Sequence, residues 1–230
     1  MTLQEAIKQR HSVRRYIHKP LSAEIIETLR KKIEECNAEG GLHIQLVTNE
    51  TRAFTGLFSY GKFSGVENYI VMVGKKADDL DERVGYYGEQ LVLLAQTLGL
   101  NTCWAGLSYR RVDEAYSVGD DEKLTCMIAL GYGATQGHKR KSKTAEQVSN
   151  ISSDSPEWFR NGVEAVLMAP TAINQQKFSF TLLPNEQDTE DKPKVLAKRG
   201  FSMVGYTKMD IGIARLHFEI GAGTENFDWA

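Results

Sequence analysis

The chain lacks the features that would direct it out of the cytoplasm or into a membrane. Its three cysteines, Cys36, Cys103 and Cys126, include no CxxC pair and cannot all pair with one another, which favours a reducing compartment. The first residues are polar where a signal peptide would be apolar. The longest apolar runs, such as residues 70–73, are far too short to span a bilayer. We therefore expect a cytoplasmic protein with no membrane contact.

The chain also has little net charge and none of the common metal or nucleophile motifs. The formal net charge is −2, and the basic residues are spread out except at 138–143, so nothing points to a nucleic-acid partner. The five histidines show no HExxH or paired-ligand spacing, which argues against a metal site. No G-x-S-x-G elbow is present, and Cys103 beside Trp104 in an expected strand is more typical of a packed thiol than of a nucleophile.

Apolar periodicity predicts helices and strands in two cycles, an α+β arrangement. Thr2 with Glu5 forms a capping box, Ser22 can cap a second helix, and Gly40 with Gly41 would end that helix. The other expected elements are strands at 43–47 and 69–73, a long helix at 80–98, strands at 102–105 and 125–130, a polar linker at 147–154, a helix after Ser155-Pro156, a strand at 177–183, a charged loop at 185–194 and a helix through 209–220.

The two cycles resemble each other. Residues 88–99 and 212–223 share their glycine spacing, and each segment is followed by a tryptophan, Trp104 or Trp229. This pattern predicts an internal duplication, with residues 1–146 as one half and 147–230 as a second, degenerate half of one compact domain. The alternative is that any two amphipathic helices ending in glycine look alike.

Two short segments, which are about 160 residues apart in the sequence, carry the chemistry. Residues 10–16 form the string R-x-S-x-R, in which Arg10, Ser12 and Arg14 offer two guanidinium groups and a hydroxyl suited to a phosphate. The string follows a helix, whose C-terminal dipole disfavours anions, so the side-chain charge must do the binding. A solvated basic turn is the alternative. The second segment is the polar turn at 169–176 between an expected helix and an expected strand.

These two segments, the order of elements and the G-L-x-T-C-W-x-G stretch at 99–106 resemble the FMN-dependent nitroreductase family. In that family the turn corresponding to 169–176 comes early in the chain and is contributed by the partner subunit. In this chain residues 36–40 occupy the position where the family has the turn, and the turn itself comes late, at 169–176. The chain therefore resembles a single-chain variant whose second half replaces the partner, which would allow a monomer. The resemblance implies an α/β/α sandwich, with a mainly antiparallel central sheet flanked by helices and two pseudo-symmetric halves.

The resemblance also assigns residues to the FMN phosphate. Arg10, His11, Ser12 and Arg14 would bind it, with His11 at a position where the family often has arginine. A basic pair after the G-Y-G segment would close on the same phosphate, and this assigns Arg140 or Lys141, with Lys139 an alternative register. A solvated charge run is the other explanation of these residues. The G-x-G-x-x-x-G spacing at 131–137 opens a basic loop and does not match a dinucleotide-binding fold.

Further residues would surround the flavin ring. The backbone of Ala105, Gly106 and Leu107 would face N5, although these residues could simply end a core strand. Lys62 would lie near the pyrimidine edge, with a solvent-exposed lysine as the alternative. From the second half, Pro170, Thr171 and Asn174 would reach the flavin, with threonine in place of the usual serine.

The function implied is an FMN-dependent NAD(P)H oxidoreductase. NADH or NADPH would pass hydride to flavin N5, and a small acceptor such as a nitroaromatic or a quinone would then take it from the same cleft. No catalytic side chain is required, because the flavin carries the chemistry. The alternatives are a flavoenzyme of the same fold with other chemistry (reductive dehalogenation or flavin cleavage) and a non-catalytic flavin-binding or ligand-binding protein. The sequence leaves open the physiological acceptor, the choice between NADH and NADPH, and the oligomeric state.

Overall fold

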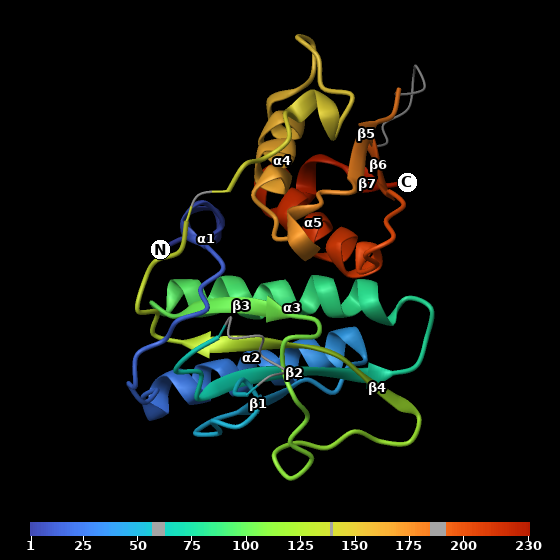
Figure 1. Cartoon of the computed structure of the whole chain (residues 1–230). Helices are drawn as coiled ribbons and strands as arrows, with labels where there is room; N and C mark the ends of the chain where they lie inside the picture. Colours follow the sequence, from blue (N-terminus) through green and yellow to red (C-terminus); the bar gives the residue numbers. More distant parts are fainter. Residues whose placement is uncertain (57–62, 139, 185–191) are drawn as a thin grey trace. The chain divides into compact units, whose positions relative to one another are not determined.

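The computed structural model describes residues 1–56, 63–138, 140–184 and 192–230 (Figure 1). Its contacts divide the chain into two compact units. The first unit comprises Met1, Gln9–Leu80 and Gln90–Lys139, and the second comprises Thr2–Lys8, Asp81–Glu89 and Arg140–Ala230.

The helices and strands follow the order that the sequence predicts, with two additional strands near the C-terminus. The α-helices are α1 (Leu3–Gln9), α2 (Ala23–Gly40), α3 (Leu80–Thr97), α4 (Glu157–Leu167) and α5 (Thr207–Ala222). The strands are β1 (Gln45–Val47), β2 (Asn68–Lys75), β3 (Asn101–Ala105), β4 (Glu122–Gly131), β5 (Phe178–Leu182), β6 (Lys194–Arg199) and β7 (Asp228–Trp229).

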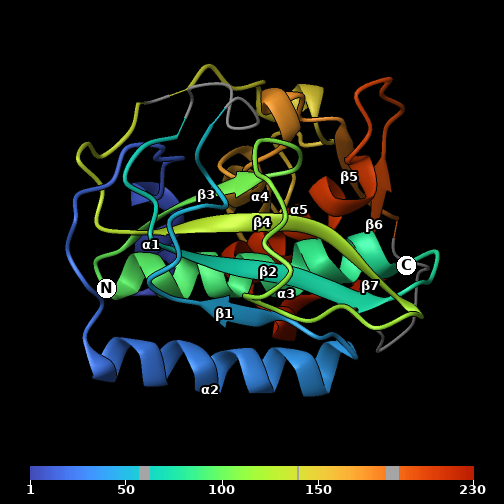
Figure 2. The same ribbon diagram turned by 60° about the horizontal axis from the view of Figure 1, so that its bottom comes forward.

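The first unit is built on a four-stranded antiparallel sheet in the order β1-β2-β4-β3. The central strand β2 is buried along seven of its eight residues, as a run of apolar residues without alternation predicts. One face packs Tyr69, Val71 and Met127 into a core cluster closed by loop residues such as Phe54 and Phe63. The opposite face buries the alternate residues of β2 and β4 on the side where α2 and α3 lie (Figure 2).

Local capping explains where the first two helices begin and end. The Thr2 backbone N–H donates to the Glu5 carboxylate at 2.7 Å, and the Glu5 N–H donates to the Thr2 hydroxyl at 3.2 Å, which is the predicted capping box. The Ile25 N–H donates to Ser22 Oγ at 3.3 Å at the start of α2. Gly41 ends α2 in the left-handed conformation (φ 57°) that glycine adopts without steric cost.

The second unit combines α4 and α5 with a three-stranded sheet in the order β5-β6-β7. Its core is aromatic: Phe180 stacks on Phe218 with ring centroids 5.1 Å apart, and Phe227 meets Phe218 edge-on at 5.1 Å. Trp158 and Trp229 are half-buried and pack against this cluster, Trp158 on Phe227 and Trp229 on Phe218. The prediction that the charged loop extends from 185 to 194 is wrong at its C-terminal end, because β6 begins at Lys194. Residues 185–191 lie outside the described part of the chain.

Two glycines set the contact between α3 and α5 inside the second unit. A Cβ on Gly212 would overlap the backbone oxygen of Glu82, and a Cβ on Gly85 would overlap the backbone oxygen of Met209. The helix backbones can therefore approach closely only because both positions lack side chains.

A buried polar pair lies on the same two helices. His217 on α5 lies 2.9 Å from the Glu89 carboxylate on α3 and 3.1 Å from the Ala165 carbonyl oxygen, and both side chains are fully buried. The Ala165 oxygen can only accept, so Nδ1 of His217 is the donor in that contact.

The predicted fold class is confirmed: the protein is α+β, with a mainly antiparallel sheet and flanking helices. Within the part of the chain that the structure describes, no helix is both long and apolar enough to cross a lipid bilayer.

Candidate functional site

The R-x-S-x-R string lies beside strand β3 in the first unit. Ser12 bridges Thr102, and the Val13 N–H donates to the Thr102 carbonyl at 3.0 Å. On its other side, the Ser64 N–H donates to the Arg14 carbonyl at 3.0 Å. The string is therefore held between β3 and the segment leading into β2, and its backbone conformation is fixed by both.

Three residues of this string affect the pKa of the Cys103 thiol. Burial raises the pKa of Cys103, and the Arg14 charge, a side-chain hydrogen bond with Ser12 and the Arg10 charge act in the opposite direction. Arg10 is 7% exposed, whereas Arg14 is exposed. Arg10, Ser12 and Arg14 thus lie within five residues of one another on a segment that pairs with β3. The protonated, buried thiol agrees with the prediction that Cys103 is a packing residue.

The glycine-containing loop after β4 covers the same string. The Ala134 N–H donates to the Arg15 carbonyl at 2.8 Å, and the Ile17 N–H donates to the Tyr132 carbonyl at 2.9 Å. A Cβ on Gly137 would lie 2.5 Å from the Cβ of His11, so only glycine fits at this position. The segment is a loop that follows a strand without opening a helix, which confirms that it is not a dinucleotide-binding turn.

The 105–107 segment lies where β3 ends. Ala105 is buried in the core cluster, Gly106 is half-buried, and Leu107 is 76% exposed in the following loop. Ala105 therefore ends a core strand, which was the alternative explanation of this segment. Gly106 and Leu107 lie beyond the end of β3. Lys62 and Lys139 lie outside the described residues.

Arg140 and Lys141, which the sequence analysis places in the first half, belong to the second unit together with the turn at 170–176. Arg140 Nη2 donates to the Leu167 and Ala169 carbonyls, at 3.1 and 2.7 Å, at the C-terminal end of α4. A cation at this end of a helix is stabilised by the unpaired carbonyls and by the dipole. The Lys141 carbonyl accepts from Asn174 Nδ2 at 2.7 Å, and the Lys141 side chain is exposed. Of the two, Lys141 has the side chain more open to a ligand.

The turn at 170–176 has an unusual backbone. Ile173, Asn174 and Gln176 have φ angles of 47°, 59° and 44°, in the left-handed region that non-glycine residues rarely adopt. The Thr171 hydroxyl accepts the Gln176 N–H at 3.1 Å, which closes the turn. Pro170 is buried, and Asn174 is exposed.

Two residues that the sequence did not assign hold this turn. Gln176 is 2% exposed and binds residues 142 and 143: its amide nitrogen donates to Ser142 Oγ at 3.0 Å, and its amide oxygen accepts the Lys143 N–H at 2.9 Å. Asp210, which is 3% exposed, accepts the Ala172 N–H at 3.0 Å. Gln176 is the last residue of the polar turn at 169–176, and Asp210 is an acid in the first turn of the apolar helix α5. Their partners are not apparent in the sequence, because these lie 33 and 38 positions away.

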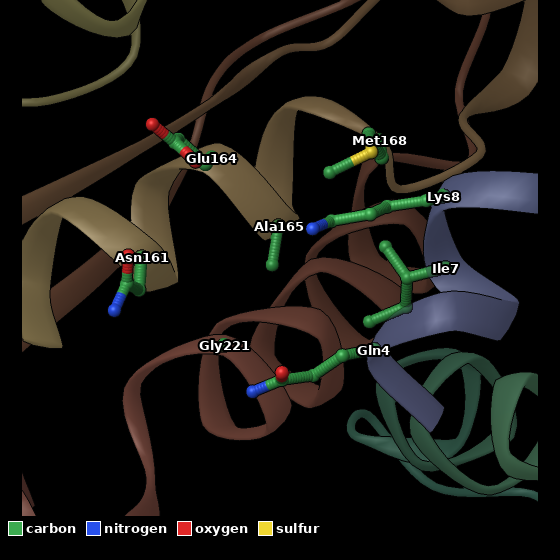
Figure 3. Close-up of a pocket in the computed structure, with 8 residues that line it drawn as sticks. All are labelled: Gln4, Ile7, Lys8, Asn161, Glu164, Ala165, Met168 and Gly221. Atoms are coloured by element: carbon green, nitrogen blue, oxygen red, sulfur yellow. The ribbon is translucent and has the colours of Figure 1, made fainter. Parts of the chain in front are cut away.

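Two cavities lie close to these elements, one in each unit. In the second unit, a cavity of about 140 Å³ is bordered by α1, α4 and α5, with Gln4 and Lys8 facing Ala165 and Gly221 (Figure 3). Ligand pockets usually have about 300–1,000 Å³, so this cavity is too small for a flavin. In the first unit, Phe54, Phe63 and Val66 line a cavity of about 440 Å³ next to Ser64, the residue that pairs with the string.

Comparison with known proteins identifies the family. A family model described as "Putative TM nitroreductase" matches residues 2–222. The chain belongs to this nitroreductase family. A search of curated proteins finds no significant match to the nitroreductase chain.

Solved structures have the same fold as this nitroreductase. A protein described as a putative nitroreductase from Thermotoga maritima has 22% sequence identity and a TM-score of 0.62, and the match covers 96% of this chain and 83% of that one. A putative nitroreductase from Desulfovibrio desulfuricans, solved in complex with FMN, has 16% identity and a TM-score of 0.52, with 68% of this chain and 99% of that one covered. A putative NADH oxidase from Clostridium acetobutylicum has 17% identity and a TM-score of 0.50, with 66% and 99% covered.

Proposed function

We propose that this nitroreductase binds FMN and transfers hydride from NADH or NADPH to a small acceptor such as a nitroaromatic or a quinone. Family membership and the FMN complex of the Desulfovibrio relative support the flavin. The name of the Clostridium relative, an NADH oxidase, supports a nicotinamide reductant. When bound, FMN would supply the redox chemistry, since its N5 can accept hydride from nicotinamide and give it to the acceptor.

The observation that carries the proposal is the placement of Arg10, Ser12 and Arg14 along one segment that is held beside β3. A phosphate needs several charge-assisted donors in a fixed geometry, and guanidinium groups provide them as forked pairs. The string is held on both sides by backbone hydrogen bonds, which fix the main chain from which these side chains extend. They fit the FMN phosphate, with His11 beside them.

The remaining predicted residues would orient the ring. The backbone of Gly106 and Leu107, beyond the end of β3, would face N5, where a glycine permits close approach. The sequence resemblance also assigns Thr171 and Asn174 to the flavin, and that assignment stays a prediction. The match to the Desulfovibrio relative covers nearly all of that protein but only 68% of this chain, which fits a second half that takes over the role of a partner subunit.

Removal of the two arginines tests the proposal. Each lost charge-assisted contact costs about 1.5–3 kcal/mol, so Arg10→Ala with Arg14→Ala should raise the FMN dissociation constant at least about tenfold. Because Arg10 is buried, Arg14→Ala alone provides a variant at an exposed position that should fold normally. Arg30→Ala with Arg199→Ala, both at exposed positions, is the matched control and should bind FMN as the wild type does. Wild-type flavin content in the Arg10/Arg14 double variant after dialysis would contradict the proposed phosphate site.

Steady-state kinetics test the reaction itself. If reductant and acceptor use one cleft in turn, double-reciprocal plots at several acceptor concentrations should be parallel. Intersecting lines would show that both substrates are bound at once and would contradict a shared cleft.

A further inference from the structure

The loop at 131–137, which is not a dinucleotide-binding turn, packs on the R-x-S-x-R string within the first unit. The Ala134 N–H donates to the Arg15 carbonyl at 2.8 Å. Further along the loop, the backbone of Gly137 lies so close to His11 that a Cβ on the glycine would be 2.5 Å from the histidine Cβ. The loop therefore contacts the string at both of its ends.

Asn101, the first residue of β3, holds this loop with both groups of its side-chain amide. Its Oδ1 accepts the Gly133 N–H at 3.0 Å, and its Nδ2 donates to the side-chain oxygen of Gln136 at 3.2 Å. Gly133 approaches so closely that a Cβ at this position would lie 2.6 Å from Asn101 Oδ1. The side chain of Asn101 thus fixes the part of the loop that lies just before Gly137.

Three segments of the first unit therefore support one another. The string pairs with β3, because the Val13 N–H donates to the Thr102 carbonyl at 3.0 Å. The loop packs on the string, and Asn101 joins the loop to β3. The backbone of Asn101 is itself fixed by the sheet, in which it pairs with Gly131 of β4. The Asn101 side chain closes this arrangement.

The burial of Asn101 shows what this side chain contributes. It is 5% exposed, and a buried amide costs free energy unless its donor and acceptor are both paired. An apolar residue would avoid this cost, as at the buried neighbours Leu100 and Cys103. The asparagine therefore adds a defined position of the loop rather than core stability.

We propose that Asn101 is a positioning residue of the phosphate site, which fixes the loop at 131–137 and thereby holds the backbone of the R-x-S-x-R string in the conformation that binds the FMN phosphate. This rests on the proposed FMN function and involves residues of the first unit only. Without the Asn101 amide, Gly137 can move away from His11, and the string gains freedom that binding must then remove. This ordering cost applies to the phosphate and not to the flavin ring.

The test compares FMN with riboflavin, which has the same ring and no phosphate, in fluorescence titrations of the full chain after removal of flavin. Asn101→Ala should raise the dissociation constant of FMN about tenfold and change that of riboflavin by less than about twofold. Circular dichroism melting shows whether the variant is folded at the temperature of the titration. Gly137→Ala disturbs the same contact from the side of the string, leaves β3 intact, and should give the same selective loss.

A second comparison uses FMN alone. If Asn101 acts through the string, its effect depends on the arginine that the string presents. In an Arg14→Ala background, Asn101→Ala should therefore weaken FMN binding by only about twofold or less, because neighbouring residues that serve one contact are not additive. An undiminished tenfold loss in that background would contradict the proposal.

Asn37→Ala is the matched control. The Asn37 amide also fixes a loop, through hydrogen bonds of 3.0 and 2.7 Å to the backbone of Ile44. This contact lies at the opposite end of the same sheet, because the adjoining His43 N–H donates to Val73 near the end of β2, whereas Asn101 pairs with the end of β4. Its affinities for FMN and riboflavin should follow the wild type.

An unchanged FMN affinity in folded Asn101→Ala would overturn the proposal. An equal loss for FMN and riboflavin would also overturn it, since a general loosening of the fold does not distinguish the two ligands. If the wild type does not bind FMN, or binds riboflavin as tightly, the proposed FMN function or its phosphate site fails instead, so the failures are distinguishable.

Discussion

The buried carboxylate of Asp210 makes a quantitative prediction about stability against pH. Its pKa is about 6 in the folded protein and 3.8 ordinarily, so the folded state holds a proton over this range that the unfolded chain has released. Stability must then fall as pH rises from about 4 to about 6 and stay level above that, because the folded state binds more protons than the unfolded state. A difference of one pKa unit corresponds to about 1.4 kcal/mol, so this side chain costs about 2 kcal/mol between pH 4.5 and pH 7.5.

Asp210→Asn removes this dependence. Urea unfolding of both proteins at the two pH values gives the difference in the free energy of unfolding, in which all other titrating groups cancel. We expect the difference, variant minus wild type, to rise by about 2 kcal/mol from pH 4.5 to pH 7.5. A difference that stays constant within about 0.5 kcal/mol would show that Asp210 is not protonated in the folded state near pH 5. A difference that falls with rising pH would mean that the carboxylate stabilises the fold, which would refute the reasoning about its cost.

Three further substitutions test the second unit. Gly212→Ala would place a Cβ on the Glu82 backbone oxygen. Overpacking should cost about 1–3 kcal/mol, which is more than the usual gain of about 1 kcal/mol from replacing glycine with alanine in a helix. We therefore expect the melting temperature to fall. An unchanged or higher melting temperature would contradict the close approach of α3 and α5. Glu89→Ala leaves His217 buried without its carboxylate and should lower the free energy of unfolding by about 3–5 kcal/mol in urea melts, and a loss below about 1 kcal/mol would show that the pair is dispensable. Thr171→Asp should raise the FMN dissociation constant in titrations by placing a carboxylate beside the flavin, and wild-type affinity would remove Thr171 from the site.

Helices and strands that are determined by neighbouring residues could be predicted from the sequence. β2 is a short apolar run, and α2 is bounded by a Ser22 cap and a left-handed Gly41, so periodicity and capping residues were sufficient. β6 and β7 were missed because they depend on pairing between distant residues, such as Val195 with Trp229. A two-residue strand has no periodicity of its own, and β6 begins with a lysine at the end of a charged stretch.

The candidate site shows the same division. The R-x-S-x-R string and the 170–176 turn could be proposed from residue types alone, because the residues of each motif are close together in the sequence. Asp210 and the support from Gln176 could not be found in this way. Their roles come from hydrogen bonds that join residues 33 to 38 positions apart, and only the folded chain brings those residues together.

The central claim is that this chain is a flavoprotein that uses reduced nicotinamide. The most direct measurement is the absorption spectrum of the freshly purified protein, recorded anaerobically before and after addition of NADH or NADPH. We expect the bands of bound oxidised FMN, their loss on addition of one of the two nucleotides, and their return when a quinone or nitroaromatic is added. A protein that neither carries FMN nor takes it up from solution, or whose bound FMN stays oxidised with both nucleotides, would contradict the account.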